Sequence, residues 1–157
     1  MSYTNADGLY ILTDGDQGVA NLTGGNNNGV KFLMIDIDDA TTIAASPAAP
    51  AANDAFIPSG SYITRASLIV SDAFAGATAA LNIGLQTAAG AAIAAQGIDA
   101  AIAVTAIDAD GDVVACDGAY VNGVVTVGAA DAYVSLDYDT AAFTAGAAKL
   151  VIEYIEV

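Results

Sequence analysis

A short aspartate-rich stretch near residue 110 is the first place in this chain where side chains could bind a ligand. Asp108, Asp110 and Asp112 alternate along Asp-Ala-Asp-Gly-Asp, and oxygen ligands at such spacing can converge on a hard cation such as Ca²⁺. The EF-hand register fails, however, because loop position six is Val113 and position twelve is Ala119, where glycine and glutamate belong. Aspartate is also a common turn residue, so both a calcium site and a plain turn stay open here.

A second acidic cluster lies at the end of the apolar run Val30 to Ile37, at Asp36, Asp38 and Asp39, and its oxygen ligands could likewise converge on a hard cation. Paired carboxylates can act as general acid and base, but glycosidase-type catalysis needs one raised pKa in a structured cleft, and most aspartates here lie in predicted turns. The chain has no histidine, which excludes Ser-His-Asp and Cys-His arrangements and histidine-based metal sites. No glycine-rich phosphate loop with a following lysine is present. We therefore expect no enzyme and no cofactor.

The single cysteine, Cys116, excludes an intrachain disulfide, and we expect it to be a buried small hydrophobic residue. The N-terminus shows neither a basic start nor an apolar segment of the kind found in secretory signals. Apolar runs of about 18 residues are absent, so no membrane-spanning helix is expected. These features predict a domain held together by its core alone.

The charge balance excludes two classes of partner. The 157 residues carry a net charge of −15 with three basic side chains. Binding to nucleic acid or to an anionic membrane requires clustered lysine and arginine, which three residues cannot provide. A hydrophobic content of 55% nevertheless allows a real core, so disorder is not expected.

The elements that must position these residues are predicted to be strands. Alanine is abundant, but the long polar helix formers are scarce and the alanine runs are interrupted by Gly, Asp, Asn and Thr. The central element is the stretch from Ile57 to Phe74, in which a turn at Pro58 to Gly60 leads into a strand. Strict alternation predicts Tyr62, Thr64, Ala66, Leu68 and Val70 on one face and Ile63, Arg65, Ser67, Ile69 and Ser71 on the other.

Further short strands are predicted along the chain, with turns of Gly, Asp and Asn between them. Thr41 to Ala45 is read as a continuation of the strand Val30 to Ile37, and Asn122-Gly123 is the strongest hairpin signal. The other predicted strands are Leu9–Thr13, Ala80–Gln86, a segment around Ile93, Ala101–Ile107, Val113–Cys116, Val134–Tyr138 and Lys149–Ile155. Such a pattern predicts an all-β sandwich or barrel, and we favour a β-sandwich with a jelly roll as the preferred topology. Residues 1–29 are read as an N-terminal arm or first hairpin, and residues 30–157 as the sandwich domain.

Several segments together resemble a known family. The residues Ile57–Ile63, Asp72–Gly76 and Leu81–Leu85 are similar to a pattern of small structural proteins of tailed bacteriophages, especially marine ones. Asp117–Ala119 and a closing hairpin from Tyr138 to Tyr154 are similar too. The resemblance covers roughly residues 30–157.

This resemblance implies a capsid decoration, or cement, protein without catalytic residues. Such a protein is a trimeric β-sandwich on the outer capsid surface of the virion, where it bridges neighbouring major capsid protein subunits. The N-terminal arm often contacts the shell in this family, which points to Tyr3, Leu9 and Tyr10 as capsid-contact residues.

The alternative function is a head fibre, knob or tail-associated module that binds the host surface, for example a glycan. Glycan sites usually present exposed aromatic side chains, and this chain has no tryptophan. Its tyrosines lie mostly at strand positions, with Tyr3, Tyr10 and Tyr120 as the exceptions. A calcium-stabilised surface protein is a third interpretation, which would show as a higher melting temperature on adding calcium.

Overall fold

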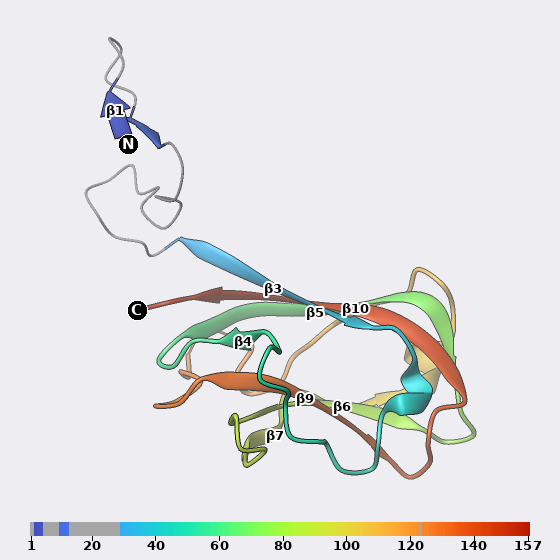
Figure 1. Cartoon of the computed structure of the whole chain (residues 1–157). Coiled ribbons are helices and arrows are strands. Elements are labelled where there is room, and N and C mark those ends of the chain that lie inside the picture. Colours follow the sequence, from blue (N-terminus) through green and yellow to red (C-terminus); the bar gives the residue numbers. More distant parts are fainter. Residues whose placement is uncertain (1, 5–9, 13–28, 123) are drawn as a thin grey trace.

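Two four-stranded antiparallel sheets face each other across one hydrophobic core (Figure 1). The computed structural model describes residues 2–4, 10–12, 29–122 and 124–157. The first sheet has the order β3 (Val30–Ile37), β10 (Ala145–Ile155), β5 (Tyr62–Ala75), β8 (Val113–Ala115). The second has the order β4 (Phe56–Ile57), β9 (Ala132–Asp139), β6 (Ala80–Gln86), β7 (Ala92–Ala103). The prediction of an all-β sandwich is confirmed.

Two further strands precede this sandwich in the chain. β1 (Ser2–Thr4) and β2 (Tyr10–Leu12) pair with each other in a separate two-stranded antiparallel sheet. Leu9, one of the predicted contact residues, lies outside the described residues. The division into an arm of residues 1–29 and a domain of residues 30–157 stays a prediction.

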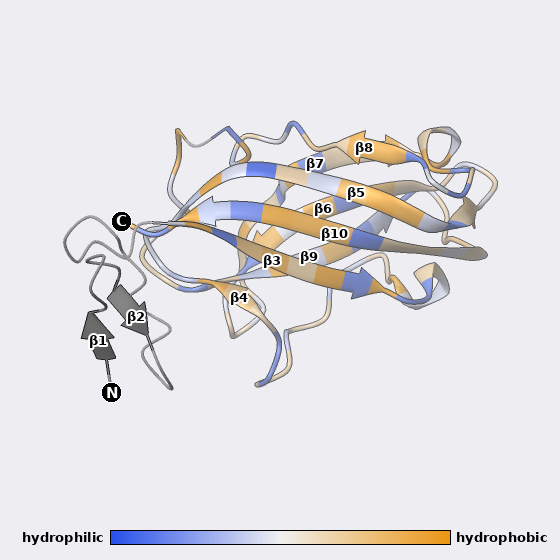
Figure 2. Ribbon diagram, turned by 90° about the horizontal axis from the view of Figure 1, so that it is seen from above, coloured by the Kyte–Doolittle hydropathy of each residue, from blue (hydrophilic) through white to orange (hydrophobic). Residues whose placement is uncertain are grey.

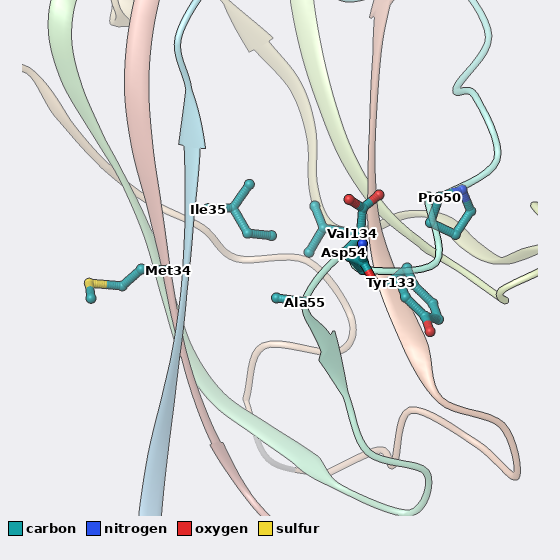
Figure 3. Close-up of a pocket in the computed structure, with 8 residues that line it drawn as sticks. Met34, Ile35, Pro50, Asp54, Ala55, Tyr133 and Val134 are labelled. Carbon is teal, nitrogen blue, oxygen red and sulfur yellow. The ribbon is translucent and has the colours of Figure 1, made fainter.

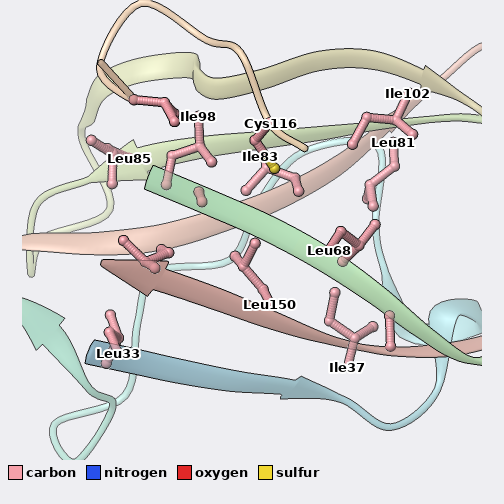
Figure 4. Packing of buried hydrophobic residues seen from close by; sticks show 14 of the residues in the cluster. Leu33, Ile37, Leu68, Leu81, Ile83, Leu85, Ile98, Ile102, Cys116 and Leu150 are labelled. Carbon is pink, nitrogen blue, oxygen red and sulfur yellow. The ribbon is translucent and has the colours of Figure 1, made fainter. Parts of the chain in front are cut away.

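The core consists of the inward side chains of both sheets. β10 alternates as predicted, with Ala148, Leu150, Ile152 and Tyr154 buried and the residues between them turned outward. Leucine and isoleucine from β5, β6 and β7 meet them from the other strands (Figure 4). Each such large apolar side chain contributes roughly 2 kcal/mol on burial. The core therefore holds the two sheets together without a disulfide.

A β-bulge changes the predicted faces of β5. Alternation places Ile63 on the same face as Arg65, and this is wrong, because Ile63 is buried and Arg65 is exposed. Arg65 lies opposite Glu153 and Ile63 lies opposite Tyr154, so Thr64 is an extra residue in β5. One extra residue reverses the alternation, because successive side chains point to opposite faces.

Two other local predictions are also wrong. Thr41 to Ala45 does not continue a strand, because a 3₁₀ turn, η2 (Ala40–Thr42), begins where the Asp39 carboxylate accepts a hydrogen bond from Thr41 N at 2.9 Å. The segments on either side of Asn122-Gly123 form no hairpin in the part of the chain that the structure describes. Tyr120 N instead donates to Gly97 O at 3.0 Å, which attaches this segment to β7.

The last two strands do not form the expected closing hairpin. β9 pairs with β4 and β6, whereas β10 pairs with β3 and β5 in the other sheet. The connection between them crosses from one sheet to the other. The segment around Ile93 and the start of Ala101–Ile107, predicted as two strands, belong to one strand, β7. The rest of Ala101–Ile107 is not strand, because a 3₁₀ turn, η3 (Val104–Ala106), follows β7.

The outer face of β6 is covered by the chain itself. Four residues of β7, 95–98, lie against the single residue Gly84 of β6, because Ile83 is opposite Asp99 while Leu85 is opposite Ala94. This large bulge passes directly over Gly84, where a Cβ atom would overlap the carbonyl oxygen of Ala95. The connection before β4 covers the end of the strand, where Gln86 Nε2 donates to Ala48 O at 2.9 Å. Every residue from Leu81 to Gln86 is therefore buried, although alternation predicts one exposed face.

Candidate functional site

The predicted calcium ligands lie in a turn that is fastened to β5 and completed by their own carboxylates. Asp110 Oδ1 accepts a hydrogen bond from Ala73 N at 2.8 Å, and Asp112 Oδ2 accepts one from Ala109 N at 3.0 Å. Within the residues that the structure describes, no three acidic, cysteine or histidine side chains come together to hold a metal ion. The structure therefore gives Asp110 and Asp112 a turn-forming role, and calcium binding, with Asp108 as the third ligand, stays a hypothesis.

The second acidic cluster is also engaged in local contacts. Asp36 forms an ion pair of 2.8 Å with Lys149 on the neighbouring strand β10. Asp39 accepts hydrogen bonds from the backbone N and the hydroxyl of Thr41, which lower the pKa of its carboxyl below the ordinary value. These two carboxylates stabilise β3 and the turn after it.

Cys116 is buried, as predicted. Burial, followed by the nearby negative charge of Asp99, raises the pKa of the Cys116 thiol to about 12. The pKa of Asp99 is also raised, chiefly because burial disfavours its charged form and then because of the charge of Asp117. A thiol with so high a pKa is a poor nucleophile at neutral pH.

A polar network on the outer side of the second sheet is not predicted by the sequence pattern. Asn82 Nδ2 donates to Asp137 Oδ1 at 2.7 Å, and Asn82 Oδ1 accepts from Ala101 N at 2.8 Å and Gln96 Nε2 at 3.2 Å. Ala101 has a φ of +52°, a conformation that costs energy in any residue with a Cβ atom. The buried Asn82 side chain therefore holds the bulge of β7 in place over β6.

A pocket of about 340 Å³ lies at one open edge of the sandwich (Figure 3). It is lined by Met34 and Ile35 of β3, by the connection from residue 50 to residue 55, and by Tyr133 and Val134 of β9. Its carboxylate, Asp54, accepts a hydrogen bond from Ala51 N at 2.7 Å and shapes the local turn. The lining residues provide no nucleophile paired with a base.

The largest unusual surface is the outer side of the first sheet, which Figure 2 views from above. We call it the open face and define it by the outward side chains of β3, β10, β5 and β8. Its exposed large hydrophobic residues are Val30, Phe32, Met34, Ile69 and Val113. A shallow hollow of about 270 Å³ lies among them, beside Arg65 and Glu153. Strict alternation along Val30 to Ile37 would identify the exposed side chains of β3. The same residues form a nearly continuous apolar run, however, and such a run indicates a strand that is buried on both faces.

Comparisons with known proteins identify the fold. No protein-family model and no curated protein matches the sequence. A chain in the capsid of Ralstonia phage GP4 is similar with a TM-score of 0.52 and 21% identity, over 82% of this chain and 85% of that one. A chain in the capsid asymmetric unit of cyanophage Pam1 is similar with a TM-score of 0.51 and 16% identity, over 92% of this chain and 98% of that one.

These similarities extend over most of each chain, and at identities of 21% and 16% they concern the fold. In addition, none of the helices that the structure describes is long and apolar enough to cross a membrane.

Proposed function

We propose that this chain is a structural virion protein that decorates and stabilises the outer surface of a phage capsid by bridging major capsid protein subunits. The observation that carries the proposal is that both similar structures come from phage capsids. Both similarities extend over most of this chain and most of the compared chain, as expected if the whole domain has a common role. The sequence resemblance described above points the same way.

The physical properties of the domain suit a repetitive surface protein. A net charge of −15 keeps the protein soluble at high local concentration. Its two sheets share one large core, and Asp36, Asp110 and Asp112, which could have served chemistry, are used in turns and an ion pair. A decoration role needs contact surfaces and no catalytic residues.

The expected jelly-roll topology belongs to the same proposal. It is supported by the strand order, in which β3 and β10 pair at one side of the first sheet while β4 and β9 pair at the same side of the second. Consecutive strands alternate between the sheets except for β6 and β7, which are neighbours. This order is the one expected for a jelly roll built from two Greek keys, and it supports that part of the proposal.

The proposal also includes the arm and the trimer. Residues 1–29 are the proposed shell-contacting segment, with Tyr3, Leu9 and Tyr10 as contact residues. A homotrimer would cover edge strands that are otherwise available for unwanted pairing. Deletion of residues 1–29 should then reduce binding to capsids while leaving the folded sandwich intact.

Quantitative mass spectrometry of purified virions tests the proposed role. The expected result is a copy number equal to that of the major capsid protein, or a simple lattice fraction of it. A handful of copies per particle would favour the head fibre or knob that binds a host surface. Absence from the virion would overturn both functions.

A further inference from the structure

The open face carries five of the nine exposed large hydrophobic residues among those that the structure describes. Phe32 is 63% exposed, Met34 is 62% exposed and Val113 is 62% exposed, and all three point outward from the first sheet. Cross-strand neighbours bring them together, because Met34 lies opposite Val151, and Ile69 lies opposite Val113. A contiguous exposed apolar face of this kind marks an interaction surface.

The charge on the open face differs from that of the remaining surface. The three basic residues of the chain, Lys31, Arg65 and Lys149, all lie on strands of the first sheet. On the open face Lys149 pairs with Asp36, and Arg65 lies opposite Glu153, so the positive and negative charges balance. Outside the open face the one basic side chain is Lys31, which turns to the other side of β3 and pairs with Glu156 at 2.6 Å, so the remaining surface is strongly acidic. The open face is therefore the surface where two such acidic molecules repel each other least.

We propose that the open face is buried against the open face of a second copy of this chain. The remaining exposed large hydrophobic residues are divided between the second sheet, the loops and the C-terminus: Phe56, Val124, Val125 and Val157. On a second copy, the open face itself is thus the best apolar match. A two-fold contact also brings Arg65 of one copy near the carboxylates of the other, and Arg65 forms no ion pair with any residue that the structure describes.

The size of this face limits the area that a contact can bury. Over the length of β3 (8 residues, about 27 Å) three strands lie side by side about 4.8 Å apart, and β8 adds 3 residues, so the face presents roughly 450 Å² per copy. The contact then buries about 900 Å² in total, a size typical of weak, transient interfaces. Weak association is therefore expected, detectable only at high protein concentration. Such a contact forms readily where copies are concentrated on a shell, so the inference rests on the proposed function in this respect.

Sedimentation velocity of the full chain over about 5 to 500 µM tests the proposal. We expect the wild type to show a concentration-dependent species with an even number of chains, and Met34→Asp to show half that mass. Val124→Asp is the matched control, because Val124 is 70% exposed, lies outside the open face and receives the same added charge. Circular dichroism and thermal melting should show that all three proteins are folded.

An unchanged mass in Met34→Asp, or equal loss in both variants, would overturn the proposal. A wild type that stays unassociated while Met34→Asp alone loses binding to capsids would also overturn it, because the face would then belong to the shell contact. The sedimentation experiment contains no capsid, so its outcome is separate from the test of the proposed function. A self-associating protein that is absent from virions would contradict the capsid role only.

Discussion

The central strands of the two sheets differ in what covers them. In the second sheet, β6 is buried on both faces, because the core covers one face and the bulge of β7 covers the other. In the first sheet, β5 and β10 are buried toward the core and present their other side on the open face. The comparison teaches that the chain covers the outer side of β6 itself and leaves the outer side of β5 and β10 exposed, free for the contact proposed above.

The strongest test of this comparison removes the close approach of β7 to β6. In Gly84→Ala, the new methyl group would overlap the Ala95 carbonyl oxygen and approach Ser135 Oγ, so the backbone of the bulge must move. We expect a loss of about 3 kcal/mol in the free energy of unfolding, measured by urea denaturation.

Gly29→Ala is the control for this substitution. A Cβ atom at Gly29 meets nothing within 4 Å, so the expected change is within about 0.5 kcal/mol. Equal stabilities of the two variants would show that β7 is not held tightly over β6.

A smaller effect is expected from removing the polar group that holds the bulge. Asn82→Leu leaves Asp137 Oδ1 and Ala101 N without their partner, and it should cost about 2 kcal/mol of unfolding free energy. Amide hydrogen exchange at Ala101 should become faster. Gln96→Ala removes only the 3.2 Å bond to Asn82 and should cost about 0.5 kcal/mol. A larger cost for Gln96→Ala than for Asn82→Leu would contradict this order.

The pH dependence of stability should have opposite signs at two aspartates. Burial raises the pKa of Asp99, so the folded chain holds this proton more tightly than the unfolded chain does. Its contribution to stability is therefore largest at low pH and falls as pH rises from about 3.8, the ordinary value, through the raised pKa. Asp99→Asn should remove this fall, as measured by urea denaturation between pH 3 and pH 7.

Asp39 provides the contrast, because hydrogen bonds from Thr41 lower the pKa of its carboxyl. Its contribution is present above the ordinary pKa and is lost as pH falls through the lowered one. Asp39→Asn should therefore weaken the loss of stability in acid. Parallel pH profiles for the two variants would refute this assignment.

The smallest effect is expected on the open face. Met34→Ser changes a side chain that has little contact with the core, so the unfolding free energy of the dilute, unassociated chain should change by less than about 0.5 kcal/mol. At concentrations where the wild type associates, the wild type should gain stability over this variant. A loss of 2 kcal/mol in the dilute chain would mean that Met34 is a core residue and that the two sheets are not as different as described.

The sequence predicts regular strands well and interrupted strands poorly. The bounds of β3 and the faces of β10 follow from apolar content and alternation, because these signals lie within one strand. The change of face at Thr64 and the burial of both faces of β6 depend on how the neighbouring strand is aligned. That alignment cannot be read from the sequence of one strand alone. A turn is one of the two interpretations that the sequence allows for the aspartates near residue 110, and the structure has a turn there. The role of Asn82, in contrast, follows only from the path of β7.

The buried thiol of Cys116 has a practical consequence for measuring how this domain opens. Alkylating reagents modify thiolates, and a pKa of about 12 together with burial makes the folded form nearly unreactive at neutral pH. Modification must then wait until the strands around Cys116 separate. Because no other thiol exists in the chain, the rate of Cys116 labelling reports directly how often the sandwich opens.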